Sequence, residues 1–141
     1  MERTGGTQVA RPWWSVMLHL DLAALKTAPG CGRGWVRTVL QEWGRSELKE
    51  TAELLVSELV TNAMLASARA GMPALRLSIA TDQHRVMISV RDFAPGAPVP
   101  RRPDDDEDSG RGLQIVGELA EQCGWHPPPD GGPGKVVWVL L

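Results

Sequence analysis

Alternating apolar and polar positions near the start of the chain predict a strand, and a change to helical spacing predicts a helix after it. Apolar residues recur at every second position between Trp13 and Leu22, which is the period of a strand. Its apolar face would carry Trp14, Val16, Leu18 and Leu20. After the breaker-rich segment KTAPGCGRGW, we expect a helix from Arg33 to Glu42 or Trp43. The apolar side of this helix would carry Trp35, Val36, Val39 and Leu40.

The middle of the chain has the pattern of a long helix followed by a hairpin. We expect the helix to run from Ser46, as its N-cap, to Arg69. The residues that stop it are Gly71 and Pro73. Two apolar stretches follow, ALRLSIA at 74–80 and RVMISVRD at 85–92. Only a short polar turn separates them, so an antiparallel hairpin is the simplest connection.

In the last third of the chain, a long polar segment precedes another helix and a final strand. Pro, Gly, Arg and Asp dominate from Phe93 to Ser109, which predicts a long loop of the kind that is usually functional or disordered. A third helix is expected from about Gly112 to Gln122. It would bury Leu113, Ile115, Val116 and Leu119. The stretch KVVWVLL predicts the last strand, which Lys135 would cap.

This order of elements predicts an α+β fold, a two-layer sandwich in which a mostly antiparallel sheet carries helices on one face. A chain of 141 residues with 43% hydrophobic content can build one core, so we expect a flexible segment 1–12 and a single domain 13–141. The net charge of −2 gives no broad attraction to nucleic acid or anionic lipid. The chain has no signal-like start, and its two cysteines have no metal or redox spacing. We expect a cytoplasmic protein without nucleic-acid or membrane partners.

Glu58 and Asn62 are the first candidates for chemistry, because they lie in an otherwise apolar stretch, SELVTNAMLAS. At positions i and i+4 they share one side of the predicted helix, with Leu55 and Leu65 on the same stripe. Burying an unpaired carboxylate there would be costly. Either the stripe faces solvent, or a polar ligand docks on it, with Glu58 as a base and Asn62 as a metal ligand.

Two further segments could bind a nucleotide. Asp92 ends the second hairpin strand just before a Pro-Gly pair, where its carboxylate could accept a hydrogen bond from an exocyclic amine and Gly96 could admit a planar ring. Gly110 and Gly112 flank Arg111 directly before the third helix, where backbone N–H groups and the helix dipole favour an anion. Taken separately, these segments could equally be an ordinary turn and a Gly-rich helix entry.

Together the three segments resemble the boxes of the GHKL, or Bergerat-fold, ATPases. ELVTNA at 58–63 matches the N-box, VRDFAPGAP at 90–98 the first glycine box, and GRGLQIVGELA at 110–120 the second. The closing GKVVWVLL is also similar to the last strand of that family. The resemblance covers nearly the whole chain and is greatest to the stand-alone anti-sigma-factor serine/threonine kinases and their actinobacterial relatives.

The resemblance implies a role for each residue of the boxes. Glu58 would be the general base, and Asn62 would coordinate the Mg²⁺ that bridges the phosphates of ATP. Asp92 would hold the adenine amine. The residues implied in nucleotide binding are Asn62, Asp92, Gly96, Gly110, Arg111, Gly112 and Leu113. The implied partners are a sigma factor and an anti-anti-sigma (STAS-like) antagonist, whose Ser or Thr would be phosphorylated, together with a homodimer.

Three departures from the family pattern keep alternatives open. Ala94 replaces a frequent Gly, AMLAS replaces a basic continuation of the N-box, and the 94–111 lid carries five acids against three arginines in RRPDDDEDSGR. The acids would either point into solvent or weaken ATP binding by repulsion. The first alternative is therefore a catalytically inactive module of the same fold that acts in transcriptional regulation. The second is a detached domain that phosphorylates histidine.

Overall fold

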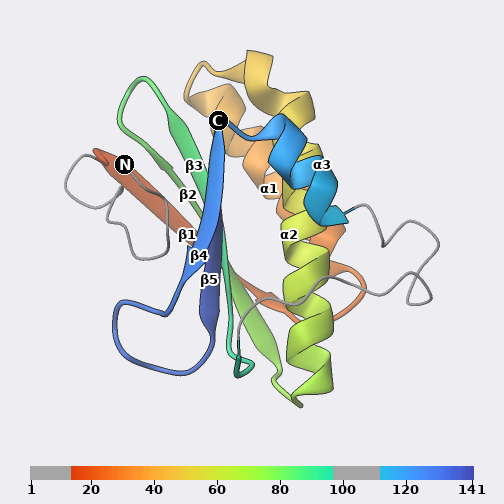
Figure 1. Ribbon diagram of the computed structural model, residues 1–141. Helices are drawn as coiled ribbons and strands as arrows, with labels where there is room; N and C mark the ends of the chain where they lie inside the picture. Colours follow the sequence, from red (N-terminus) through yellow and green to blue (C-terminus); the bar gives the residue numbers. More distant parts are fainter. Residues whose placement is uncertain (1–13, 97–111) are drawn as a thin grey trace.

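In the part of the chain that the structure describes, five strands form one antiparallel sheet in the order β1-β2-β3-β5-β4, and the helices lie on one side of it (Figure 1). The computed structural model describes residues 14–96 and 112–141, with side chains from 116 onward in the second range. The strands are β1 (Val16–Ala23), β2 (Ala74–Thr81), β3 (Val86–Asp92), β4 (Gln122–His126) and β5 (Lys135–Leu140). The helices are α1 (Ala28–Glu42), the 3₁₀ turn η2 (Ser46–Leu48), α2 (Lys49–Arg69) and α3 (Gly112–Leu119). The predicted two-layer α+β sandwich is confirmed.

The main core lies between the sheet and the helices. β-branched and leucine side chains at alternate positions of β2 and β3 point to this layer, where α1 and α2 cover them. The apolar stripe predicted for α1 also faces inward. Fully buried members are Val36, Leu40, Leu55, Val56, Val60, Leu75, Leu77, Ile79, Val86 and Ile88. The sheet and α2 therefore form a rigid platform for residues on the side of α2.

A second, smaller cluster occupies the helix-free face of the sheet. It consists of Ala80, Met87, Trp138 and Leu140, with Trp14 packed against them. The prediction that Trp14 shares a face with Val16, Leu18 and Leu20 is therefore wrong. Trp14 precedes β1, so the alternation of the strand does not constrain its side chain. Val16 and Leu18 are exposed near the start of this edge strand.

Helix α1 begins at Ala28, five residues before the predicted start at Arg33. Pro29 lies in the first turn, where its missing N–H has no intrahelical partner to lose. Gly32 lies where α1 approaches α2 and β2, because a Cβ there would lie 3.2 Å from atoms of both Val56 and Leu77. Glycine allows this close approach, and the Gly-rich segment belongs to the helix.

Three further boundaries differ from the prediction. Ser46 is not the N-cap of α2, which is Leu48, but the first residue of the 3₁₀ turn before that helix. Helix α3 ends at Leu119, and Gln122 begins β4, an edge strand that was not predicted. Val116 is buried as expected, whereas Leu119 is 38% exposed. The predicted burial of Leu113 and Ile115 lies outside the described side chains. By contrast, Gly71 at φ +72° ends α2 as expected.

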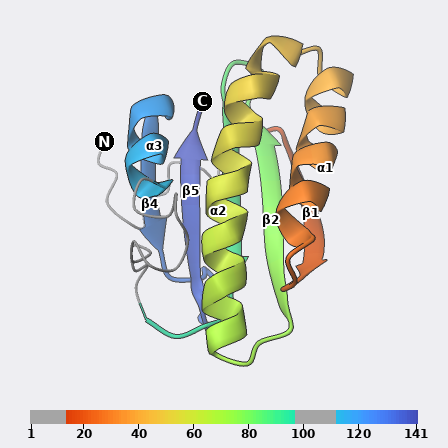
Figure 2. The same ribbon diagram turned by 90° about the vertical axis from the view of Figure 1, so that its right-hand side faces the viewer.

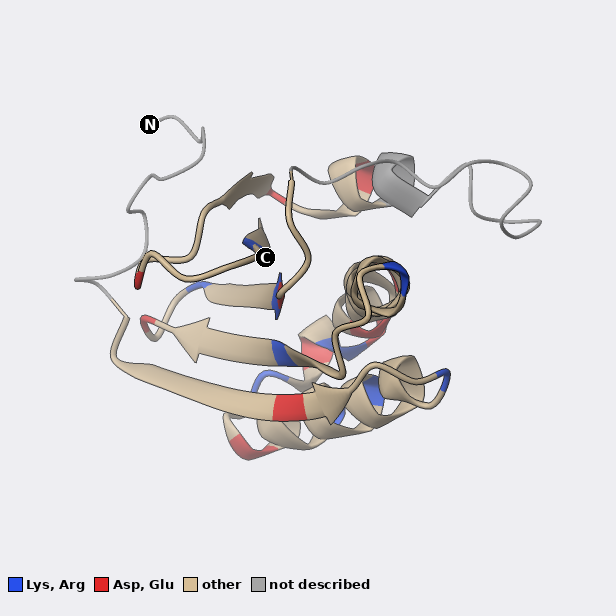
Figure 3. Ribbon diagram, turned by 90° about the horizontal axis from the view of Figure 1, so that it is seen from below, with Lys and Arg blue, Asp and Glu red and all other residues tan. Residues whose placement is uncertain are grey.

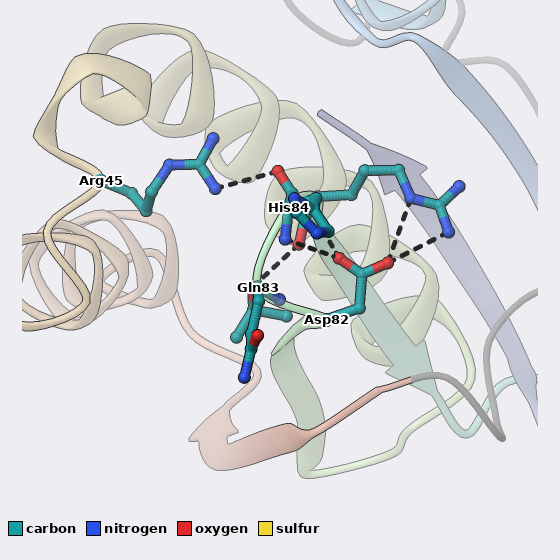
Figure 4. A network of polar contacts seen from close by, with 6 residues as sticks. Arg45, Asp82, Gln83 and His84 are labelled. Carbon is teal, nitrogen blue, oxygen red and sulfur yellow. Dashed lines mark hydrogen bonds and ion pairs between the residues drawn. The ribbon is translucent and has the colours of Figure 1, made fainter.

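A polar network fixes the turn between β2 and β3 (Figure 4). This turn lies at the start of β3, and Asp92 lies at the other end of the strand. Asp82 accepts backbone N–H groups from His84 at 2.9 Å and Arg85 at 2.7 Å, and it pairs with the Arg85 guanidinium at 3.1 Å. Burial raises the pKa of Asp82, but these hydrogen bonds outweigh it and hold the pKa below its usual value. Arg45 donates to the carbonyl of His84 at 3.0 Å, so the segment before α2 is tied to the hairpin.

Charges of both signs are interspersed over the described elements (Figure 3). Arg37 of α1 pairs with Glu53 of α2 at 3.0 Å, and Arg76 of β2 pairs with Asp21 of β1 at 2.8 Å. These pairs are largely exposed and join neighbouring elements, so charge there is balanced locally. None of the helices in the described ranges is long and apolar enough to cross a membrane.

Candidate functional site

Helix α2 presents Glu58 and Asn62 one turn apart on a half-buried side, as its 3.6-residue period requires. Leu55 on the same stripe is fully buried and Leu65 is half-buried, so the stripe is not an open solvent-facing surface. Helix α2 packs against both β3 and α3, and Figure 2 shows α3 beside α2 on the same face of the sheet. The two polar side chains are therefore half-buried on a helix that has β3 and α3 as neighbours.

Asn62 has an unusual environment, since its Oδ1 is buried and accepts no hydrogen bond from any described residue. Leaving such a group unsatisfied costs about 1–3 kcal/mol, because it gives up its hydrogen bonds to water. A folded protein usually retains such an atom only where something else, such as a ligand, an ion or water, satisfies it. The carboxamide oxygen is a hard donor of the type that Mg²⁺ prefers, so this residue fits the predicted metal.

Asp92 lies at the end of β3 and is only 2% exposed. Its Oδ1 accepts the backbone N–H of Ala94 at 2.9 Å, which closes a tight turn after the strand. Gly96 follows with φ +92°, and a Cβ added there would meet no atom of the described residues within 4 Å. The positive φ explains the glycine, and the open space beyond it suits the predicted entry of a planar base. Adenine recognition by Asp92 stays a prediction.

The ammonium group of Lys135 lies on the Asp92 carboxylate, a contact that sequence reasoning missed. Lys135 Nζ is 3.0 Å from Oδ2 and 3.2 Å from Oδ1, and Lys135 is 5% exposed. The two residues are direct register partners of the antiparallel β3–β5 pair. Lys135 was expected only to cap the last strand, and it lies 43 residues from Asp92 along the chain. The β3–β5 register was the signal that could have revealed the pair.

Gly134 fixes the position of this ion pair. Its φ is +97°, and a Cβ there would overlap the Asp92 carbonyl oxygen and lie 2.7 Å from the Cα of Phe93. We expect Gly134→Ala to lower the free energy of unfolding by about 2–5 kcal/mol, because backbone strain adds to overpacking. Urea unfolding measures this change.

Gly131 provides the matched control for Gly134→Ala. It lies in the same loop with φ +76°, but a Cβ there meets nothing within 4 Å. Gly131→Ala should therefore show only the conformational cost of about 1–2 kcal/mol. Equal losses at the two positions would contradict the close approach of Gly134 to the end of β3.

The third predicted segment, the Gly-rich start of α3, lies only partly within the described residues. Helix α3 begins at Gly112, as predicted, and its N-terminus points toward the end of the molecule where β3 ends and β5 begins (Figure 1). The predicted phosphate-binding residues Gly110 and Arg111, and the side chain of Leu113, lie outside the described residues. The position of α3 gives the site a helix N-terminus, which favours anionic groups.

The described residues indicate how a metal would be held. No group of three or more His, Cys, Asp or Glu side chains with metal-binding geometry occurs in ranges 14–96 and 116–141. Mg²⁺ commonly binds through one or two protein oxygens together with water and phosphate oxygens, so Asn62 alone is compatible with it. The site therefore offers one amide oxygen for a metal, one carboxylate beside it on α2, and a second carboxylate at the end of the sheet.

Comparison with known families agrees with this arrangement. The model of the histidine kinase-like ATPase domain matches residues 23–140, from the end of β1 to the end of β5. No curated protein matches the chain. The matched range contains Glu58, Asn62 and Asp92, and an ATPase domain implies ATP binding. The anti-sigma-factor type lies beyond this match and stays a prediction. The chain belongs to the histidine kinase-like ATPase domain family.

Proposed function

We propose that this protein is an ATP-dependent serine/threonine kinase of the anti-sigma-factor type. It would bind a sigma factor, and it would phosphorylate a Ser or Thr of an anti-anti-sigma (STAS-like) antagonist with Mg-ATP, working as a homodimer. The observation that carries the proposal is the buried Oδ1 of Asn62, which accepts no hydrogen bond from the described residues and lies one turn from Glu58 on the half-buried side of α2. A buried amide oxygen that is left to bind a ligand, next to a carboxylate, is the arrangement expected for a site that binds a triphosphate with its metal ion.

Phosphoryl transfer depends mainly on the positioning of the reactants and on a proton acceptor, and little on covalent chemistry by the protein. Glu58 would take the proton of the attacking Ser or Thr hydroxyl while the hydroxyl oxygen forms a bond to the γ-phosphorus of ATP. The bond between the γ-phosphorus and the β–γ bridging oxygen would break at the same time and release ADP. Asn62 would hold Mg²⁺, which when bound neutralises phosphate charge. These two roles explain why a largely apolar helix carries an acid and an amide.

The remaining residues would hold the ends of the nucleotide. Asp92 would accept the exocyclic amine of the base, and Gly96 would leave the base room. Backbone N–H groups between Gly110 and Gly112, with Arg111 between them and Leu113 after them, would bind the phosphates at the start of α3. The base and the phosphates would then be held at opposite ends of one site.

Asn62→Ala tests the proposal with two readouts of opposite sign. Removing a ligand of the metal should weaken Mg-ATP binding by about tenfold or more, measured by calorimetry with and without Mg²⁺. Removing a buried oxygen that has no partner among the described residues should also raise the free energy of unfolding, by about 1 kcal/mol. Weaker binding by a more stable protein would point to a functional role for Asn62.

Ser67 is the matched control on the same helix. Its Oγ is also buried without a partner among the described residues, but Ser67 is not a predicted site residue. Ser67→Ala should raise stability in the same way and leave Mg-ATP binding unchanged. Unchanged Mg-ATP affinity in Asn62→Ala would reject the proposed metal role.

A second function is favoured by one specific observation, the Lys135–Asp92 ion pair, which already engages the carboxylate proposed to bind the base. In this alternative the protein is an interaction module in transcriptional regulation that has lost turnover. The two functions differ in a simple assay with purified protein, Mg-ATP and candidate antagonists. No phosphoprotein from any cognate antagonist, whether ATP binds tightly or weakly, would select the module.

A further inference from the structure

The Asp92 carboxylate has little hydrogen-bonding capacity left for a base. A carboxylate has about four lone-pair sites. Oδ1 accepts the Ala94 N–H at 2.9 Å and lies 3.2 Å from Lys135 Nζ, which is also 3.0 Å from Oδ2. An exocyclic amine must therefore share the carboxylate with an ammonium group, or else displace it.

Displacement of Lys135 is unfavourable because of where its side chain lies. Lys135 is 5% exposed and begins β5 directly opposite Asp92, while Gly134 holds the strand against the end of β3. An ammonium group moved off its partner here would remain largely buried without a counter-charge, which is strongly disfavoured. The ion pair should persist when a nucleotide binds.

We propose that Lys135 is a specificity-determining residue that removes the selection for a 6-amino purine. This inference rests on the proposed function, which assigns the base to Asp92. The ammonium group offers a donor to a 6-oxo group, and the carboxylate keeps one acceptor site for a 6-amino group. The site would then accept purine nucleoside triphosphates of both kinds with similar affinity.

The unmodified protein gives the first test. We would measure the affinities of ATP, of inosine triphosphate and of purine riboside triphosphate, which lacks any 6-substituent, by calorimetry with Mg²⁺. The dissociation constants of ATP and inosine triphosphate should lie within about threefold of each other, since the carboxylate can bond the 6-amino group and the ammonium group can bond the 6-oxo group. Purine riboside triphosphate has neither group and should bind about tenfold more weakly. A preference of tenfold or more for ATP over inosine triphosphate would overturn the inference. This test does not depend on any variant folding.

Lys135→Met gives the second test, because methionine has a similar length and no N–H donor. With the carboxylate released, the preference for ATP over inosine triphosphate should rise about tenfold or more, as expected for a charge-assisted hydrogen bond. The double variant Asp92→Asn/Lys135→Met is the control and should lose most of that gain. A general weakening of the fold would not change the ratio of two affinities in this way.

The outcomes separate this inference from the proposed function. An unchanged base preference in Lys135→Met, with ATP still bound, overturns the role of Lys135 and leaves the proposed function standing. Failure of every triphosphate to bind both the unmodified protein and Lys135→Met overturns the two together. A raised preference in Lys135→Met, lost again in the double variant, supports both.

Discussion

Replacing Glu58 by Gln should lower the rate of phosphoryl transfer to the antagonist by about 100- to 10,000-fold, the usual contribution of a general base. The amide has nearly the same shape as the carboxylate but cannot take the proton of the attacking hydroxyl. Glu58 is assigned to the proton and not to the nucleotide, so the affinity for Mg-ATP should stay near that of the unmodified protein. Single-turnover transfer from labelled ATP and calorimetry measure the two quantities separately.

Glu53→Gln is the matched control for Glu58→Gln. Glu53 is another half-buried glutamate of α2, and it pairs with Arg37 of α1 at 3.0 Å. The same substitution there should leave transfer unchanged, because an ion pair of this kind holds two helices and no nucleotide. Undiminished transfer in Glu58→Gln would reject Glu58 as the base. Slow transfer accompanied by equally weak ATP binding would show a role in holding the nucleotide instead.

Strongly patterned segments were predictable from the sequence because local physics decides them. β2 and β3 are rich in leucine, isoleucine and valine between turn signals, and they pair as a hairpin across a short turn. β4 has only the residues QCGWH, with no alternation that marks a strand. It forms because Gly124 lies opposite the buried Trp138 and β5 offers its edge. That cause is tertiary, so a local pattern cannot show it.

The start of α1 is a second case in which tertiary contacts override the local pattern, here one that argues against a helix. Three glycines and a proline within seven residues normally argue against a helix. Here Gly32 lies against Val56 and Leu77, so the absence of a side chain permits contacts between α1 and the rest of the core. A glycine that weakens an isolated helix can thus stabilise a packed one. Propensity alone could not distinguish the two cases.

Part of the candidate site could be predicted from local sequence motifs, and part depends on contacts between distant segments of the chain. Motif order placed Glu58 and Asn62 on one side of α2 and Asp92 at the end of β3, and the structure has them there. The partner of Asp92 was not predictable in the same way, because Lys135 reaches it only through the β3–β5 register. The missed residue is also the one that alters the chemistry expected of the site. Sequence motifs identify the groups available, whereas pairing decides which of them are already engaged.

The Asp92–Lys135 pair leads to the second large effect, on stability. Asp92→Ala should lower the free energy of unfolding by about 3–5 kcal/mol, because it leaves the Lys135 ammonium group buried without its counter-charge. The variant also loses the hydrogen bond that closes the turn at Ala94. Urea unfolding followed by tryptophan fluorescence measures the loss. A stability equal to that of the unmodified protein would show that the ammonium group reaches water and that the pair is not the constraint described above.

The double variant Asp92→Asn/Lys135→Met separates two contributions to the free energy of unfolding. One is the cost of an unpaired buried charge, and the other is the net contribution of the ion pair. Replacing a buried ion pair by neutral groups of similar size is often close to neutral, so this variant should recover most of the stability lost in Asp92→Ala. The amide oxygen introduced by Asp92→Asn could still accept the Ala94 N–H and preserve the turn. Failure to recover would mean that the pair itself contributes net stability. Because Asp92→Ala perturbs the fold, lost ATP binding in that variant cannot be assigned to recognition, and Asp92 is better tested through the charge-balanced double variant.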